Sequence, residues 1–153
     1  MPTELWHVLN EVELADTATA VGGLNASVAE DGANWSQGQR QLLCIARALL
    51  RNSKLVMLDE ATASCDVTTD AMVQRVIRRV FRDCTVLTVA HRIHTIADSD
   101  RIMVLSEGNI AEFDSPATLL QTPGSHYRAL VQESNSGQAN MKGSPRAASP
   151  RAS

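Results

Sequence analysis

The stretch Lys54-Leu55-Val56-Met57-Leu58-Asp59-Glu60 decides the fold class. Four consecutive apolar residues are typical of a strand buried in a parallel sheet, and two carboxylates follow at its carboxyl end. Open α/β sheets bind ligands at the carboxyl ends of their strands. Taken alone, Asp59 and Glu60 are equally compatible with two solvated acids at a strand end. The neighbouring segments are needed to decide between the two interpretations.

The segments on both sides alternate between helix and strand patterns. Apolar residues at helical spacing predict helices over residues 4–16, 36–50 and 72–81, and short apolar runs predict strands over 85–89 and 102–105. Gly108 then predicts a hairpin turn into 110–113, Ser115 and Pro116 predict a helix start, and 126–132 predicts a last helix. This order indicates an α/β fold with a parallel sheet core and flanking helices over residues 1–133.

The composition excludes several classes of protein. A net charge of -3 offers no electrostatic basis for binding nucleic acid. No apolar run approaches the roughly 20 residues that span a bilayer, and the N-terminus lacks the pattern of a signal peptide. Three cysteines without CxxC spacing indicate reduced thiols, and we expect Cys44 and Cys84 in the core. Residues 134–153, rich in Ser, Pro and Arg, predict a disordered tail.

The segment Trp35-Ser36-Gln37-Gly38-Gln39-Arg40-Gln41 resembles the signature sequence of the ATP-binding cassette (ABC) family, usually written Leu-Ser-Gly-Gly-Gln. Trp35 stands in place of Leu, and Gln37 in place of the first Gly. Three further segments are similar to the family's Walker B strand, D-loop and H-loop: 54–60, 61–66 and 89–92. Four motifs in this order are far more specific than any one of them. The resemblance extends over about residues 4–133 and is greatest to the second nucleotide-binding domain of subfamily C, the multidrug-resistance-associated exporters.

The resemblance implies a partial P-loop NTPase fold and a function that uses ATP and Mg²⁺. For the chain's own nucleotide it implies that Asp59 holds Mg²⁺, that Glu60 activates water and that His91 contacts the γ-phosphate. In the family, two domains sandwich ATP head to tail. A second set of residues is therefore implied to face the nucleotide of the partner domain: Ser36, Gln37, Gly38, Gln39 and Asp66.

The signature has a physical basis at the level of single residues. Ser36 stands where a predicted helix begins, and the first-turn N–H groups with the helix dipole favour an anion there. Because Gly38 has no side chain, backbone can approach a phosphate closely. The simpler interpretation of Ser36 is an ordinary N-cap of an amphipathic helix. Gln37 adds bulk where the family has Gly, which affects how tightly a phosphate is held.

The sequence contains no P-loop, G-x-x-x-x-G-K-[ST], whose N–H groups and Lys hold the phosphates. Its only lysines, Lys54 and Lys142, lack that context, and 35 residues precede Ser36. In the family the P-loop lies before the signature. We therefore expect the second half of a cassette, with the N-terminal half of the domain missing. Such a chain should bind ATP negligibly by itself, be inactive alone, and leave apolar faces uncovered.

The favoured hypothesis is an ATP-binding and ATP-hydrolysing fragment of an ABC exporter at the cytoplasmic face of a membrane. Its partners would be a second nucleotide-binding domain and the exporter's transmembrane domains. The alternative is a non-catalytic module that completes the ATP site of a partner cassette in trans. A soluble cassette protein of DNA repair or translation receives no support from the acidic balance of charge.

Overall fold

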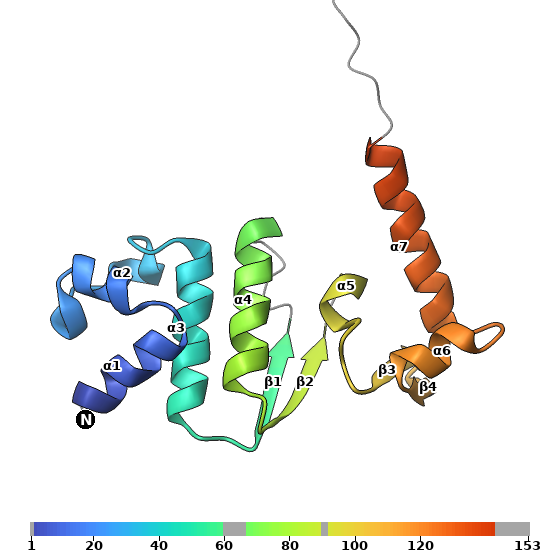
Figure 1. Cartoon of the computed structure of the whole chain (residues 1–153), viewed down its shortest axis with the longest axis horizontal. Coiled ribbons are helices and arrows are strands. Elements are labelled where there is room, and N and C mark those ends of the chain that lie inside the picture. Colours follow the sequence, from blue (N-terminus) through green and yellow to red (C-terminus); the bar gives the residue numbers. More distant parts are fainter. Residues whose placement is uncertain (1, 60–66, 90–91, 143–153) are drawn as a thin grey trace, which may run out of the picture. The chain divides into compact units, whose positions relative to one another are not determined.

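The computed structural model describes residues 2–59, 67–89 and 92–142. The chain divides into two compact units, residues 1–91 and 92–153 (Figure 1). The first unit contains the signature segment and the strand that ends in Asp59. Its elements are α1 (Pro2–Glu11), α2 (Ala15–Ala20), the short 3-10 turns η1 (Gly23–Asn25) and η2 (Glu30–Gly32), α3 (Gln37–Leu50), β1 (Leu55–Asp59), α4 (Val67–Val80) and β2 (Thr85–Val89).

The first predicted helix is interrupted. The apolar spacing predicted one helix over residues 4–16, but α1 ends at Glu11 and α2 begins at Ala15. Glu13 between them adopts a left-handed backbone conformation, with a φ of 60°. The break allows Val12 and Leu14, on either side of Glu13, to be buried together, which a continuous helix would not permit.

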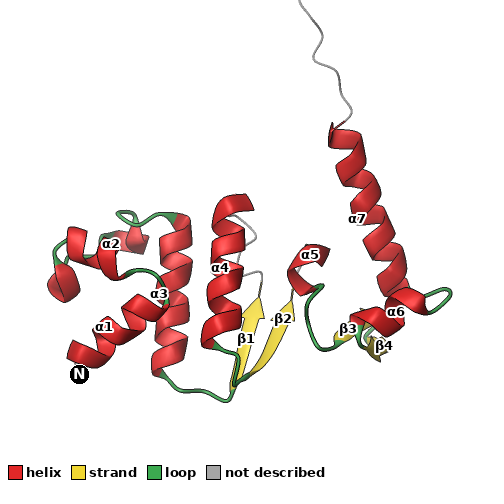
Figure 2. Ribbon diagram, viewed as in Figure 1, coloured by secondary structure: helices red, strands yellow, loops and turns green. Residues whose placement is uncertain are grey.

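Helices α3 and α4 cover one face of a parallel pair of strands. Figure 2 shows β1 and β2 as adjacent arrows that point the same way, with α4 next to β1 and α3 next to α4. The core lies between the helices and this sheet, and it is aliphatic apart from Trp35 and Phe81. Leu42 and Ile45 of α3 contribute to it, as the helical spacing predicted, whereas Cys44 is exposed and our expectation of a core thiol was wrong.

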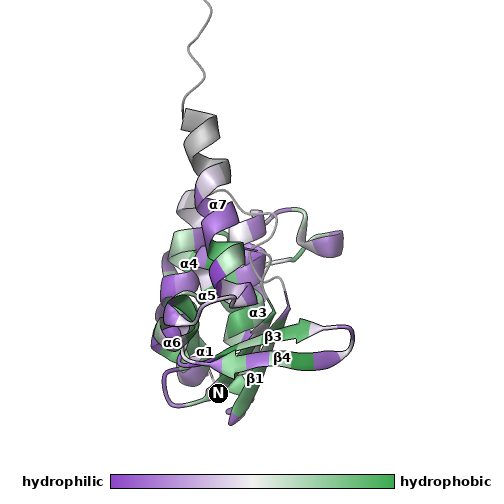
Figure 3. Ribbon diagram, turned by 90° about the vertical axis from the view of Figure 1, so that its right-hand side faces the viewer, coloured by the Kyte–Doolittle hydropathy of each residue, from purple (hydrophilic) through white to green (hydrophobic). Residues whose placement is uncertain are grey.

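The opposite face of this sheet is uncovered. Val56 of β1 is buried at 6% exposure, whereas its neighbour Met57 is 71% exposed. Met57 pairs with Leu87 of β2, which is exposed on the same face because side chains alternate along a strand. Figure 3 shows β1 as a largely hydrophobic ribbon. The expectation of an uncovered apolar face is therefore confirmed within this unit.

The second unit contains α5 (Ile93–Ile96), β3 (Ile102–Ser106), β4 (Asn109–Asp114), α6 (Pro116–Gln121) and α7 (His126–Lys142). Strands β3 and β4 form the predicted hairpin, with left-handed backbone at Glu107 and Gly108 in the turn. Ser115 caps α6 as predicted, since its Oγ accepts a hydrogen bond of 3.2 Å from the Thr118 N–H. A small core gathers around Ile102, Leu119 and Tyr127.

Two expectations for this unit need revision. The strand over 102–105 was expected to join the parallel sheet, but β3 pairs antiparallel with β4 in a sheet of its own within the described residues. The last helix was expected over 126–132, with a disordered tail from residue 134. Helix α7 instead runs to Lys142. The rest of the predicted tail, 143–153, lies outside the described residues.

Candidate functional site

The signature segment forms the first turn of α3, and its sequence explains why the helix begins there. Ser36 is the N-cap: its Oγ accepts a hydrogen bond of 3.3 Å from the Gln39 N–H. In return the Gln39 side-chain oxygen accepts one of 2.8 Å from the Ser36 N–H. This reciprocal capping box satisfies two donors that a helix start would otherwise leave open. Ser36 and Gln37 are exposed, whereas Gly38 is buried.

The loop before the signature is fastened to α3 by residues that the sequence analysis did not single out. The Asn34 side chain bridges the loop, accepting from the Ala29 N–H at 3.1 Å and donating to the Ser27 carbonyl at 3.0 Å. Arg40 of α3 donates to the Asp31 carbonyl at 3.1 Å. An Asn two residues before the N-cap of a helix is a usable sequence signal, because its amide commonly bonds to nearby backbone. The loop and the helix start are thus held in one arrangement.

The carboxylate expected to hold Mg²⁺ lies at the end of β1. Asp59 is the last residue of the strand and is exposed, and it pairs in the parallel register with Val89 of β2. The two strands therefore end at the same edge of the sheet. Glu60, Asp66 and His91 lie outside the described residues. Among the residues that are described, no three His, Cys, Asp or Glu side chains gather as metal ligands.

The start of α3 and the end of β1 belong to the same end of the first unit. Helix α3 runs back from Ser36 to Leu50, and β1 then returns in the opposite direction to Asp59 (Figure 1). Helix α4 begins at this end too, because Gly38 of α3 lies against Thr69 in its first turn. The structure therefore brings Ser36, Gln37, Gly38 and Gln39 together on one helix turn and places Asp59 at the same end of the unit.

Comparison with known proteins decides the family. A profile described as ABC transporter matches residues 2–63. The chain is 56% identical over 131 residues to ABC transporter C family member 3 of Dictyostelium discoideum, covering 85% of this chain and 9% of that protein. It is 47% identical over 137 residues to ATP-binding cassette sub-family C member 4 of Homo sapiens, covering 89% of this chain and 10% of the relative. The chain belongs to the ABC transporter family.

Membership of the ABC transporter family confirms the predicted fold class, a partial P-loop NTPase fold of the α/β type. ABC transporter domains bind ATP, so the chain is a fragment of a nucleotide-binding domain. It spans about a tenth of the length of the curated relatives that it matches. Among the described helices, none combines the length and apolar character needed to cross a bilayer.

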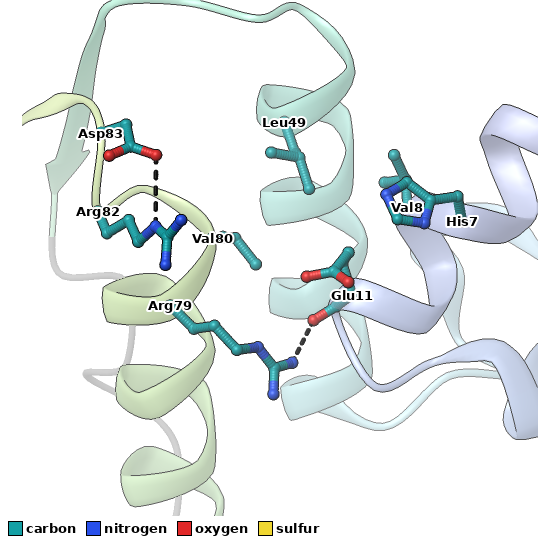
Figure 4. A pocket seen from close by; sticks show the side chains of 8 residues that line it. All are labelled: His7, Val8, Glu11, Leu49, Arg79, Val80, Arg82 and Asp83. Atoms are coloured by element: carbon teal, nitrogen blue, oxygen red, sulfur yellow. Dashed lines mark hydrogen bonds and ion pairs between the residues drawn. The ribbon is translucent and has the colours of Figure 1, made fainter.

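The hollow drawn in Figure 4 is a different place on this ABC transporter fragment. It lies between α1, α3 and α4, with Leu49 near the carboxyl end of α3 and Arg79 near that of α4. The Arg79 guanidinium donates a hydrogen bond to the Glu11 carbonyl and pairs with the Glu13 carboxylate at 3.3 Å. Helix α3 is about 20 Å long at 1.5 Å per residue. The hollow is therefore at the opposite end of α3 from Ser36.

Proposed function

We propose that this chain is the second half of a nucleotide-binding domain of a subfamily C exporter and acts at the cytoplasmic face of a membrane. The second such domain of the exporter is the one it resembles most. The observation that carries the proposal is the exposed, capped start of α3 at the same end of the unit as Asp59. A helix start favours anions, and a carboxylate at a strand end suits a hydrated Mg²⁺.

The two groups of residues have separate roles in this proposal. Ser36, Gln37, Gly38 and Gln39, together with Asp66, contact the ATP that a partner nucleotide-binding domain holds. Asp59 holds the Mg²⁺ of the chain's own site, Glu60 orients or deprotonates water, and His91 donates a hydrogen bond toward the γ-phosphate. Mg²⁺-ATP supplies the phosphoanhydride bond whose hydrolysis drives transport. The exposed Ser36 hydroxyl and Asp59 carboxylate fit these ligands, since neither is buried within the unit.

A second function is favoured by a specific feature of the sequence. The 153 residues contain no P-loop motif, so this chain holds only the later motifs of its own site. In contrast, the sequence retains all the residues proposed to contact a partner's nucleotide, from Ser36 to Gln39 and Asp66. The alternative proposal is therefore a non-catalytic module that completes the ATP site of a partner cassette in trans.

The test uses two substitutions that cap a helix equally well but differ in charge. Ser36→Asn and Ser36→Asp both preserve the N-cap, whereas only the second places a negative charge beside the partner's phosphates. The full chain is mixed with a P-loop-bearing nucleotide-binding domain of a subfamily C relative, and association is measured with and without Mg²⁺-ATP. We expect ATP-dependent association for the wild type and Ser36→Asn, and at least about a tenfold weaker complex for Ser36→Asp. Equal association of all three would contradict the proposal.

A second measurement separates the two functions. The partner domain is used with its own catalytic Glu replaced, and a P-loop-bearing segment of a relative is added as a separate polypeptide. Any remaining ATP turnover then comes from the site that contains Asp59, Glu60 and His91. Turnover supports the ATPase fragment, whereas ATP-dependent association without turnover supports the module that acts in trans.

A further inference from the structure

Gly38 is a point of close contact between α3 and α4, the two long helices of the first unit. It is the second residue of α3 and is buried against α4. A Cβ atom at position 38 would overlap the Thr69 Cγ2 methyl, while the Thr69 Cβ and Oγ1 atoms would lie at ordinary contact distances of 3.7 and 4.0 Å. A side chain at this position would therefore require the Thr69 γ-methyl to shift.

Space, and not backbone conformation, explains the glycine. Among the glycines that the structure describes, five others, such as Gly22 and Gly108, have left-handed φ angles, but Gly38 does not. An alanine would therefore be compatible with the backbone, and glycine inside a helix costs about 1 kcal/mol relative to alanine. The close packing of Thr69 on Gly38 is what offsets this cost. From the sequence, Gly38 was expected only to let a phosphate approach the backbone, and its packing against Thr69 is a separate reason for a glycine here.

The contact joins two segments that are distant in the sequence. Gly38 follows Ser36 by two positions in the signature, and Thr69 lies three positions after Asp66 in the first turn of α4. Gly38 itself and Asp66, which precedes α4 in the sequence, belong to the set that the proposed function directs at the partner's nucleotide. A displacement of the start of α4 would therefore strain its packing on the start of α3, because close-packed interiors transmit strain.

We propose that Thr69 is a positioning residue whose γ-methyl, seated in the space left by Gly38, fixes the signature turn of α3 to the first turn of α4. The structural part of this inference stands on the packing alone. Its functional part, that the contact aligns both segments on the partner's ATP, rests on the proposed function.

The test is a rescue in the full chain. Gly38→Ala should lower the midpoint of thermal unfolding by about 5–10 °C, as overpacking of a core contact does. Thr69→Ser removes the obstructing methyl and keeps the hydroxyl, so the double variant Gly38→Ala/Thr69→Ser should regain most of that loss. Amide hydrogen exchange over residues 37–50 and 67–80 gives the same comparison without requiring a cooperative transition.

Two matched controls make the rescue specific. Thr68→Ser is the same chemical change at the adjacent, exposed position, and it should not rescue Gly38→Ala. Thr69→Val keeps the γ-methyl group and replaces the hydroxyl with a second methyl, so it should not rescue Gly38→Ala either. If Thr69→Ser restores nothing, or if Thr68→Ser restores as much, the proposed contact is overturned, whatever the function of the chain.

The functional part is read from ATP-dependent association with the P-loop-bearing domain. Gly38→Ala should weaken the complex by about tenfold, and Thr69→Ser in the same chain should return it to near the wild-type affinity. Restored stability without restored association would overturn the positioning role and assign Gly38 to direct phosphate approach. A wild-type chain that shows no ATP-dependent association would instead contradict the proposed function and leave the result of the stability rescue intact.

Discussion

The Glu112 carboxylate accepts a hydrogen bond of 2.7 Å from the backbone N–H of His126, so a strand of the second unit caps its longest helix. Its other oxygen accepts from the Tyr127 N–H and from the Ser125 hydroxyl, each at 3.1 Å. Ser125 is the local N-cap of α7, because its Oγ accepts a hydrogen bond of 3.2 Å from the Arg128 N–H. Glu112 adds a second cap from outside the helix by accepting from the His126 and Tyr127 N–H groups. The negative charge of Glu112 also interacts favourably with the helix dipole, whose positive end is the N-terminus of α7.

This cap predicts a dependence of stability on pH. Desolvation raises the pKa of Glu112, but the hydrogen bonds from His126, Tyr127 and Ser125 outweigh it and hold the pKa below the usual 4.5. A carboxyl group with a lowered folded-state pKa stabilises the fold fully above about pH 4.5, and this contribution is lost as the pH falls through the lower value. We expect Glu112→Gln to unfold at a lower temperature than the wild type at neutral pH. The two should converge on acidification, as followed by circular dichroism.

The control for this prediction is Glu107→Gln in the exposed hairpin turn, which makes the same chemical change away from α7. It should differ little from the wild type at any pH. A gap between wild type and Glu112→Gln that stays constant from neutral pH to about pH 3 would contradict the capping role, since the difference must titrate with the carboxyl group.

The capping box at the start of α3 predicts a pattern of stability changes. Ser36→Ala should lower the free energy of unfolding by about 1 kcal/mol, whereas Ser36→Asn should change it little. Because Ser36 and Gln39 satisfy each other's backbone, Ser36→Ala and Gln39→Ala should be less than additive. Urea denaturation of the wild type, the two single variants and the double variant measures this coupling. Ser136→Ala, at an exposed position of α7, is the matched control and should stay within about 0.5 kcal/mol of the wild type.

The elements that depend on local pattern were predictable from the sequence. The helix after Ser36, the strands that become β1 and β2 and the hairpin around Gly108 follow from hydrophobic period, capping and turn chemistry. Local pattern cannot identify which strands pair, because pairing depends on distant segments, and β3 was for this reason assigned to the wrong sheet. The break at Glu13 was missed since Leu5, Val8, Leu9 and Val12 form a helical stripe that carries no signal of a break after it.

In the candidate site, too, features that depend on neighbouring residues were predictable from the sequence, whereas features that depend on distant residues were not. Ser36 was predicted as an N-cap from its residue type and position alone, and the structure confirms it. The burial of Gly38 depends on Thr69, 31 positions further along the chain, so no pattern around Gly38 could indicate it. Glu112 was overlooked for the same reason, because its partners at the start of α7 lie 13 to 15 positions away.

The uncovered face of the sheet formed by β1 and β2 predicts that substitutions at two adjacent residues of β1 change the stability by very different amounts. Met57 is exposed, so Met57→Gln should change the free energy of unfolding by no more than about 0.5 kcal/mol while reducing self-association and binding of a hydrophobic dye. Val56→Ala, on the covered face, should cost about 2 kcal/mol. Chemical denaturation and light scattering measure the two effects. Strong destabilisation by Met57→Gln would mean that this face is covered in solution.

The absence of a P-loop in the sequence predicts the nucleotide affinity of the chain by itself. Four or five charge-assisted hydrogen bonds to phosphate, at about 1.5–3 kcal/mol each, would be missing, a loss of roughly 6–15 kcal/mol. Micromolar binding corresponds to only about 8 kcal/mol. We therefore expect no measurable binding of Mg²⁺-ATP in isothermal titration calorimetry. A P-loop-bearing domain of a relative is the positive control, and a dissociation constant below about 100 µM for this chain would show that Asp59 and its neighbours hold nucleotide without a P-loop.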